Sequence, residues 1–360
     1  MTCRKFNFFT LIFVCIGLFV VAIPIVIIDP YFHYHAPLDD FSYKLSNERY
    51  QNNGIVRNFD YDAIITGTSM TENFKTSEMN QLYDVQTIKV PYSGGGYKEV
   101  SDNIQVALRN NSKIKIIVWG LDAHYLIVDK DAPFRGMAEQ GYAYPYYLIN
   151  ENPFDDVAYL WNKDIFFEAI DTVEYTKQGK ETTSFDKYGY WYDACIDEFG
   201  KEGVLSVYNR KENKTESIGR LPEDKRQIVK ENVEQNLGDV VKTHPNVKFI
   251  FFIPPYSICW WDARDRDGNI TYYIDAMVIL AEELLPYSNV ELYCFNNNYE
   301  MICNLNNYKD EAHYSAEINS KMLNWMRNKE YLLTEQNYQE YFSEIQEFYL
   351  NYDYDSIFAE

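Results

Sequence analysis

Short apolar runs alternate with stretches of helical spacing along most of the chain between residues 59 and 330. Runs such as "IIVW" and "FIFFI" are apolar at every position. Strands of this kind are typical of a parallel sheet that is covered by helices on both faces. Strands are expected in the segments 62–67, 85–90, 113–120, 246–255 and 289–297.

Helical spacing fills the gaps between these strands. In the stretch "YKEVSDNIQVALRN", Val100, Ile104 and Leu108 recur on one helical face. Further helices are expected over 77–84, about 222–243, about 272–285 and 316–328. This alternation predicts an α/β fold with a parallel sheet of about five strands.

The N-terminus carries an uncharged, mostly apolar run from Phe6 to Ile28, preceded by Arg4 and Lys5. The run is long enough to cross a bilayer as a helix. The positive-inside rule places the N-terminus in the cytoplasm and the rest of the chain outside the cell. A cleaved signal peptide is the alternative, but the run ends "IVIIDP" without a small-residue cleavage site. A single-pass transmembrane anchor over residues 1–29 is therefore expected, with an extracellular domain on the cell membrane.

Four regions follow from these patterns. Residues 30–58 are expected to form a stalk or irregular lead-in, 59–330 the α/β domain, and 331–360 a C-terminal helical extension that packs on the body. An aromatic-rich insert at about 123–220 separates the third and fourth strands. Because it follows the carboxyl end of a strand, it is interpreted as a cap over a site. A peripheral packing insertion remains the alternative.

Charge and composition narrow the functional classes. The formal net charge of −21 argues against a nucleic-acid partner, which requires basic surface, and is compatible with a carbohydrate partner. None of the 5 His residues pairs at helical metal-ligand spacing, and no Cys pair has CxxC spacing. Neither a metal site nor a cofactor is expected.

Ser69 is the candidate nucleophile, because the first strand breaks at "GTS" immediately before a polar run. Taken alone, this break is more typical of an ordinary strand-to-helix turn. Near the end of the α/β domain, Asp310 lies three residues before His313. This spacing lets a carboxylate orient one imidazole nitrogen while the other accepts a proton from a Ser hydroxyl.

Two further turns leave the sheet at the same expected edge. After the second strand, the three glycines of "PYSGGGYKE" leave backbone N–H groups open to an anion, as an oxyanion requires. After the third strand, "WGLDAHY" supplies Asp122. The residues from four separated segments are thus expected to meet at one site.

Together these segments resemble the four blocks of the SGNH (GDSL-type) hydrolases, a family with a three-layer flavodoxin-like fold. The resemblance covers about residues 60–330 without the insert. It implies that Ser69 is the nucleophile, His313 the base and Asp310 its orienting acid. It also implies an oxyanion hole made by the N–H groups of Ser69 and of Gly94, with Gly95 as the near-equivalent choice.

Two blocks depart from the family pattern. Asp122 stands where the family usually has an oxyanion-binding Asn, and the first block reads Gly-Thr-Ser where Gly-Asp-Ser is commoner. An ionised carboxylate would repel a developing oxyanion, so Asp122 is a doubtful member of the hole. Asp122 also motivates an alternative, a degenerate SGNH-like domain that binds a glycan or a membrane acyltransferase without chemistry.

The anchored layout is similar to that of envelope-acylation proteins of the D-alanyl transfer and alginate O-acetylation type. The Pro-Pro-x-Ser turn in "FIPPYSICWW" adds to this likeness. The resemblance implies a bacterial Ser-dependent acyl-ester hydrolase or O-acyl (acetyl) transferase. Its substrate would be a surface polysaccharide or a teichoic-acid-like polymer, and its partner a membrane-bound O-acyltransferase. Whether it hydrolyses or transfers is left open.

Overall fold

The computed structural model describes residues 3–132, 144–150 and 152–359, which form two compact units. One unit comprises residues 1–60 and 142–184, and the other comprises 61–141 and 185–360. The expected insert is therefore divided between them, and its residues 133–143 and 151 lie outside the described part. The domain boundaries inferred from the sequence remain a prediction.

The larger unit contains a six-stranded sheet with the order β2-β1-β3-β4-β5-β6. The first five strands are parallel and only β6 is antiparallel. They are β1 (Ala63–Thr66), β2 (Thr87–Lys89), β3 (Ile116–Gly120), β4 (Lys248–Ile253), β5 (Val290–Cys294) and β6 (Leu332–Leu333). The α/β class and the five expected strands are confirmed. β6 was missed because two residues are too few to form a periodic pattern.

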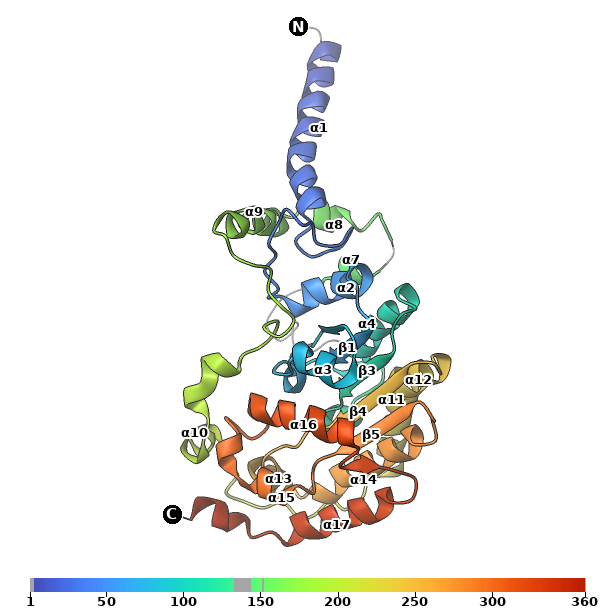
Figure 1. Ribbon diagram of the computed structural model, residues 1–360, viewed down its shortest axis with the longest axis vertical. Helices are drawn as coiled ribbons and strands as arrows, with labels where there is room; N and C mark the ends of the chain where they lie inside the picture. The colour runs from blue at the N-terminus through green and yellow to red at the C-terminus, as the bar shows by residue number, and fades with distance from the viewer. Residues whose placement is uncertain (1–2, 133–143, 151, 360) are drawn as a thin grey trace. The chain divides into compact units, whose positions relative to one another are not determined.

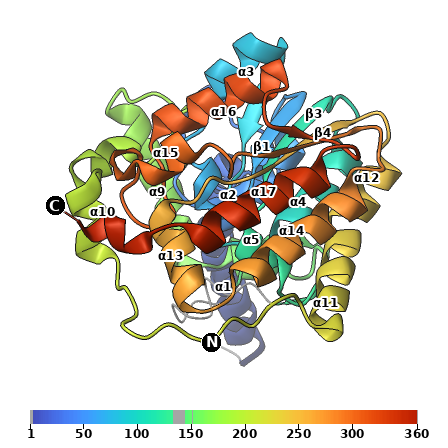
Figure 2. The same ribbon diagram turned by 90° about the horizontal axis from the view of Figure 1, so that it is seen from below.

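Helices cover both faces of this sheet. Figure 2 shows α3 (Thr76–Tyr83) and α16 (Ala316–Asn328) on one side and α4 (Tyr97–Asn110), α12 (Asp239–Thr243) and α14 (Ile270–Leu284) on the other. The expected helix over 222–243 is interrupted, because the π-helical turn η3 (Glu234–Gly238) separates α11 (Glu223–Val233) from α12.

The remaining helices of the larger unit are short, except in the tail. The C-terminal extension packs on the body through α17 (Tyr338–Asn351), where Tyr349 stacks on Trp261 with ring centroids 3.8 Å apart. The further elements are η1 (Ser69–Thr71), α5 (Ala123–Leu126), η2 (Tyr192–Glu198), α10 (Lys201–Val207), α13 (Ile258–Arg266), α15 (Tyr299–Cys303), η4 (Leu305–Asn307), α17 (Tyr338–Asn351) and η5 (Tyr354–Phe358).

The smaller unit is helical and contains the N-terminal run as α1 (Cys3–Ile28), drawn in dark blue in Figure 1. Among the described residues, α1 is the one helix long and apolar enough to cross a membrane. The expected irregular lead-in contains α2 (Glu48–Asn58), capped by the Asn47 side chain. The other helices of this unit are α7 (Tyr146–Ile149), α8 (Val157–Leu160) and α9 (Lys163–Lys177).

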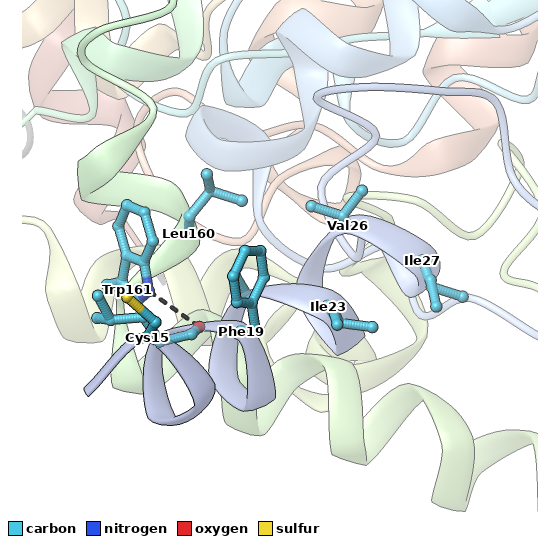
Figure 3. Close-up of a pocket in the computed structure, with 9 residues that line it drawn as sticks. Cys15, Phe19, Ile23, Val26, Ile27, Leu160 and Trp161 are labelled. Carbon is cyan, nitrogen blue, oxygen red and sulfur yellow. Dashed lines mark hydrogen bonds between the residues drawn. The ribbon is translucent and has the colours of Figure 1, made fainter. Parts of the chain in front are cut away.

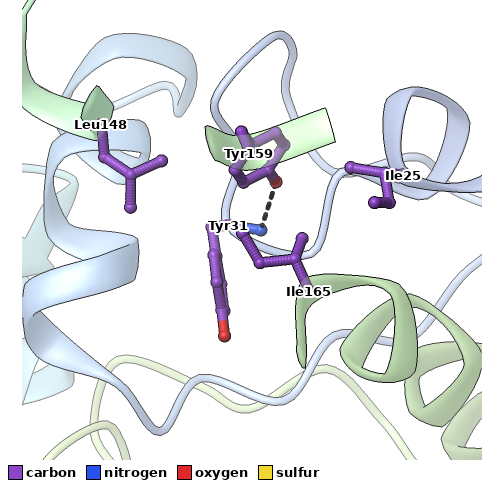
Figure 4. Close-up of a cluster of buried hydrophobic side chains, with 5 residues drawn as sticks. All are labelled: Ile25, Tyr31, Leu148, Tyr159 and Ile165. Atoms are coloured by element: carbon purple, nitrogen blue, oxygen red, sulfur yellow. Dashed lines mark hydrogen bonds between the residues drawn. The ribbon is translucent and has the colours of Figure 1, made fainter. Parts of the chain in front are cut away.

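A small core holds these helices to the end of α1. Ile25 and Tyr31 pack with Leu148, Tyr159 and Ile165 (Figure 4). The Tyr31 backbone N–H donates to the Tyr159 hydroxyl at 3.4 Å. Part of the aromatic-rich insert thus packs around the base of the apolar helix, which the sequence pattern did not indicate.

Candidate active site

Ser69 lies at the point where the chain leaves β1, in the first position of η1. Gly67 has a φ of +144°, and a Cβ there would stand 2.7 Å from the Thr71 side chain and 3.0 Å from the Gly120 carbonyl. Only glycine fits this position without strain. The Thr68 side chain caps the turn by accepting from the Met70 N–H. The sharp break in "GTS" therefore has a steric cause, and it leaves Ser69 half-buried at the sheet edge.

The structure brings Ser69, His313 and Asp310 together in one chain of hydrogen bonds. Ser69 Oγ lies 2.9 Å from His313 Nε2. On the other side of the ring, His313 Nδ1 lies 2.8 Å from Asp310 Oδ2 and 3.0 Å from Oδ1. With Nδ1 donating to the carboxylate, Nε2 is the nitrogen that accepts the Ser69 proton. This is the relative arrangement that a Ser-His-Asp mechanism requires.

Asp310 is held as a carboxylate by its surroundings. Burial by itself would raise its pKa, but donation from the His313 ring and from the backbone N–H groups of His313 and Ala312 lowers it below the usual value. Both N–H groups donate to Asp310 Oδ1 at 2.8 Å. The three-residue spacing thus lets one carboxylate cap the local turn and also orient the imidazole.

The His313 loop is tied directly to the Ser69 turn. The Tyr314 hydroxyl donates to the Met70 carbonyl at 2.9 Å, and the Asn319 amide donates to the same oxygen at 3.2 Å. Tyr308 and Tyr314 pair as an isolated β-bridge, which closes the loop on itself. These buried bonds fix the distance between His313 and Ser69.

The "PPYS" segment after β4 also holds the loop that carries His313 in place. Ser257 donates to the Glu311 carbonyl through both its N–H, at 3.1 Å, and its hydroxyl, at 2.8 Å. The Tyr308 hydroxyl donates to the Pro255 carbonyl at 2.8 Å. The rigid exit from β4 therefore has a positioning role that its proline content alone did not indicate.

The sequence predicts an oxyanion hole from the backbone N–H groups of Ser69 and of Gly94 or Gly95, and the hydrogen bonds of these groups distinguish between the two glycines. In the part of the chain that the structure describes, the N–H groups of Ser69 and Gly94 donate to no protein acceptor. Gly95, in contrast, donates its N–H to the Tyr92 carbonyl at 2.7 Å. The Gly94 peptide has a φ of +64°, and its carbonyl accepts from the Tyr125 hydroxyl at 2.6 Å. Between the two glycine candidates, the geometry favours Gly94.

Asp122 is buried after β3, and its side chain is fully occupied by other groups. Thr68 Oγ1 donates to Asp122 Oδ2 at 2.5 Å, and the Tyr256 hydroxyl donates to Oδ1. Burial, together with the Asp122 charge, raises the pKa of Tyr256 well above its usual value, so this hydroxyl remains a donor. Asp122 thus braces the residue before Ser69 and has no N–H on its side chain to offer an oxyanion.

Trp191, from the later part of the aromatic insert, contacts the base. Its ring meets the His313 ring edge to face, with centroids 5.5 Å apart. Asn73 Oδ1 accepts the backbone N–H groups of Trp191 and Tyr192, each at 3.2 Å. Residues 185–207 of the insert therefore pack beside the site within the larger unit.

Sequence reasoning missed the supporting roles of Thr68, Trp191 and Tyr256. The aromatic insert and the "PPYS" turn were both noticed, but only tertiary contacts single out individual residues in them. Among the described residues, no group of three or more His, Cys, Asp or Glu side chains is arranged to hold a metal ion.

The site lies at the carboxyl ends of β1 and β3, where the strand order reverses direction. Open α/β sheets bind ligands in the crevice at this switch point. Comparison of the chain with protein-family models, with curated proteins and with solved structures finds no significant match. The functional argument therefore depends on the geometry of the site.

Proposed function

We propose that this protein is a Ser-dependent acyl-ester enzyme of the flavodoxin-like SGNH type. The observation that carries the proposal is the bond chain from Ser69 Oγ through His313 to Asp310, with its links of 2.9 Å and 2.8 Å. An isolated Ser–His contact has many structural explanations. A His that is oriented by a half-buried carboxylate and faces a Ser at a sheet switch point has the geometry of an activated nucleophile.

In the first half-reaction, Ser69 Oγ attacks the carbonyl carbon of the acyl ester while His313 Nε2 takes the Ser69 proton. The N–H groups of Ser69 and Gly94 donate to the oxyanion that forms. Asp310 stabilises the imidazolium without taking its proton. His313 then returns the proton to the leaving alcohol, and the acyl group stays on Ser69.

In the second half-reaction, a water or a sugar hydroxyl attacks the acyl-Ser69 with His313 again as base. Water gives hydrolysis, and a sugar hydroxyl gives O-acyl transfer. The same three residues serve both outcomes, so the acceptor decides between them. The hydroxyls of Thr68 and Tyr256 donate to the Asp122 carboxylate and hold it in place, so in this proposal the oxyanion hole consists of two backbone donors without Asp122.

The site of action in this proposal is the outer face of a cell membrane, with α1 as the anchor and the N-terminus in the cytoplasm. The length and apolar character of α1 support the anchor alone, and the orientation is inferred from Arg4 and Lys5 by the positive-inside rule. The substrate class is an acylated surface polysaccharide or teichoic-acid-like polymer. A membrane-bound O-acyltransferase is the proposed partner if acyl transfer is the reaction.

The test is labelling and turnover of the full chain in detergent micelles. A fluorophosphonate probe is expected to label the wild type at Ser69, and a chromogenic acetate ester is expected to be hydrolysed. Ser69→Ala should abolish labelling and lower kcat by at least about 10³-fold, as for other lost nucleophiles. Ser206→Ala is the matched control, since Ser206 is exposed on α10.

A wild type as inert as Ser69→Ala in both assays would contradict the enzyme proposal and favour the non-catalytic binding alternative. Unlabelled wild type that is given the acetate ester together with an oligosaccharide acceptor separates the two reactions. Acyl groups found on the sugar indicate transfer, whereas free acid alone indicates hydrolysis.

A further inference from the structure

The end of α1 is closed by a buried carboxylate. Asp29 has a φ of +47°, and its side chain accepts the backbone N–H groups of His33 at 2.9 Å, Tyr34 at 2.7 Å and His35 at 3.0 Å. It also accepts the Tyr159 hydroxyl at 2.6 Å. These bonds fold the chain after α1 into a tight polar turn. The bond from Tyr159, which belongs to α8, holds that helix beside the end of α1.

A second carboxylate, that of Asp156, adds to the polar groups at the end of α1. Asp156, immediately before α8, lies 3.0 Å from His33 Nε2 and accepts the Tyr34 hydroxyl at 3.2 Å. Polar side chains of both segments therefore gather where α1 ends at Ile28.

From this level, the short helix α8 leads back along α1 toward its middle. The indole N–H of Trp161 donates to the Leu18 carbonyl at 3.1 Å. Leu18 lies ten residues before Ile28, which is about 15 Å at the helical rise of 1.5 Å per residue. The polar atom of Trp161 is thus satisfied within the protein, which lets the ring occupy apolar surroundings at low cost.

The space between α8 and α1 is an apolar groove of about 520 Å³ (Figure 3). Leu160 and Trp161 form one wall, and Phe19, Ile23 and Ile27 of α1 form part of the other. The side chain of Trp161 remains 42% exposed. Large apolar side chains are exposed elsewhere in the same segment, namely Phe154, Val157, Phe167 and Ile170.

We propose that the segment from Phe154 to Ile170 is a second membrane-contacting element, which lies in the outer leaflet beside α1 with lipid acyl chains in its groove. The proposal rests on the insertion of α1, and it is independent of the catalytic proposal. The position of the groove along α1 indicates that its occupant is lipid acyl chains. A bilayer core about 30 Å thick takes up about 20 helical residues. Counted from Lys5, those residues reach Ile25, so Leu18 and Trp161 lie within the apolar layer.

The charged side chains of α9 limit how deeply the segment from Phe154 to Ile170 enters the membrane. Asp164, Glu168 and Asp171 recur on one side of the helix, whereas Phe167 and Ile170 lie on the neighbouring side. Ionised carboxylates are costly in the hydrocarbon, so α9 is held at the interface while Trp161 reaches below it.

Tryptophan fluorescence in liposomes provides the test. Trp161 is the one Trp of the smaller unit, since the other five lie at 119, 191, 260, 261 and 325. The full chain is reconstituted in phosphatidylcholine brominated either near the carbonyl end or near the methyl end of its acyl chains. Emission is expected to be quenched, more strongly by the bromines near the methyl end, because Leu18 lies seven residues, or about 10 Å of helix, below Ile25. Trp161→Phe should remove most of the quenching, and Trp325→Phe should leave it unchanged.

A second variant and an extraction control complete the design. Val157→Asp places a charge on an exposed position, so it should preserve the fold while weakening the quenching of Trp161. Resistance to alkaline extraction reports insertion of α1 separately. Extraction-resistant protein whose emission is unquenched at every protein-to-lipid ratio would overturn the proposal and favour a protein partner in the groove. Protein removed by extraction would overturn both the anchor and this element, without bearing on ester turnover.

Discussion

Ser69 Oγ and His313 Nε2 lie 2.9 Å apart, although 244 positions separate the two residues in the chain. The Met70 carbonyl accepts from Tyr314 and Asn319, so the residues next to the nucleophile and next to the base are themselves joined. The distance between Ser69 Oγ and His313 Nε2 is therefore maintained by neighbouring buried bonds as well as by the Ser–His contact itself.

Replacing Asp310 should impair turnover more than binding. In Asp310→Asn, the amide no longer stabilises the imidazolium and favours the wrong imidazole tautomer, so kcat should fall by about 10³-fold or more with a small change in KM. The measurement is ester hydrolysis at saturating substrate. Asp102→Asn is the matched control, because Asp102 pairs with Lys98 on α4, away from the site. Equal kcat in Asp310→Asn and wild type would rule out this role.

The same carboxylate should also affect stability in acid. Its pKa is lowered in the folded chain by donation from His313 and from two backbone N–H groups, which together outweigh burial. A lowered pKa stabilises the fold above the unfolded value of about 4, and this contribution is lost as pH falls through the folded value. The difference in urea midpoint between wild type and Asp310→Asn should therefore be constant near pH 6 and narrow below about pH 4. A difference that widens in acid would contradict this sign.

Thr68 and Tyr256 should act together through Asp122. Thr68→Val and Tyr256→Phe each leave one buried Asp122 oxygen without its donor, which should cost about 1–3 kcal/mol of stability. Each is also expected to lower kcat by about tenfold, because the turn that carries Ser69 loses its brace. The double variant should be non-additive by at least about 0.5 kcal/mol, since both hydroxyls share one carboxylate. Strict additivity in kcat and in urea midpoints would show that Asp122 does not link them.

Trp191 should matter as a support for the base. Trp191→Ala removes the edge-to-face contact with His313, and kcat should fall by about tenfold, a loss of roughly 1.4 kcal/mol of transition-state stabilisation. Trp191→Phe keeps an aromatic edge and should recover most of that loss. Trp325→Phe, outside the site, serves as the control. A Phe variant as impaired as the Ala variant would argue against ring contact as the cause.

Local patterns in the sequence were sufficient for much of the fold. The apolar runs at β1 to β5 predict buried parallel strands because each run is apolar on both faces. The two-residue β6 and the π-helical turn η3 could not be predicted, because each is too short to produce a recognisable pattern of apolar and polar positions. The helix α2 was also missed, because "ERYQNNGIVRN" has no strong apolar stripe.

The alternation of strands and helices, the long apolar N-terminal helix and four short segments with reactive residue types could all be predicted from the amino-acid sequence. The spacing of apolar residues, the placement of glycines and the residue types encode these features, and each of these signals acts over a few neighbouring positions. Only the tertiary structure decided that Ser69 meets His313, that Asp122 faces two hydroxyls, and that Trp161 returns to Leu18. Each of these contacts joins residues far apart in the chain, and their meeting depends on strand order and packing that no local pattern specifies.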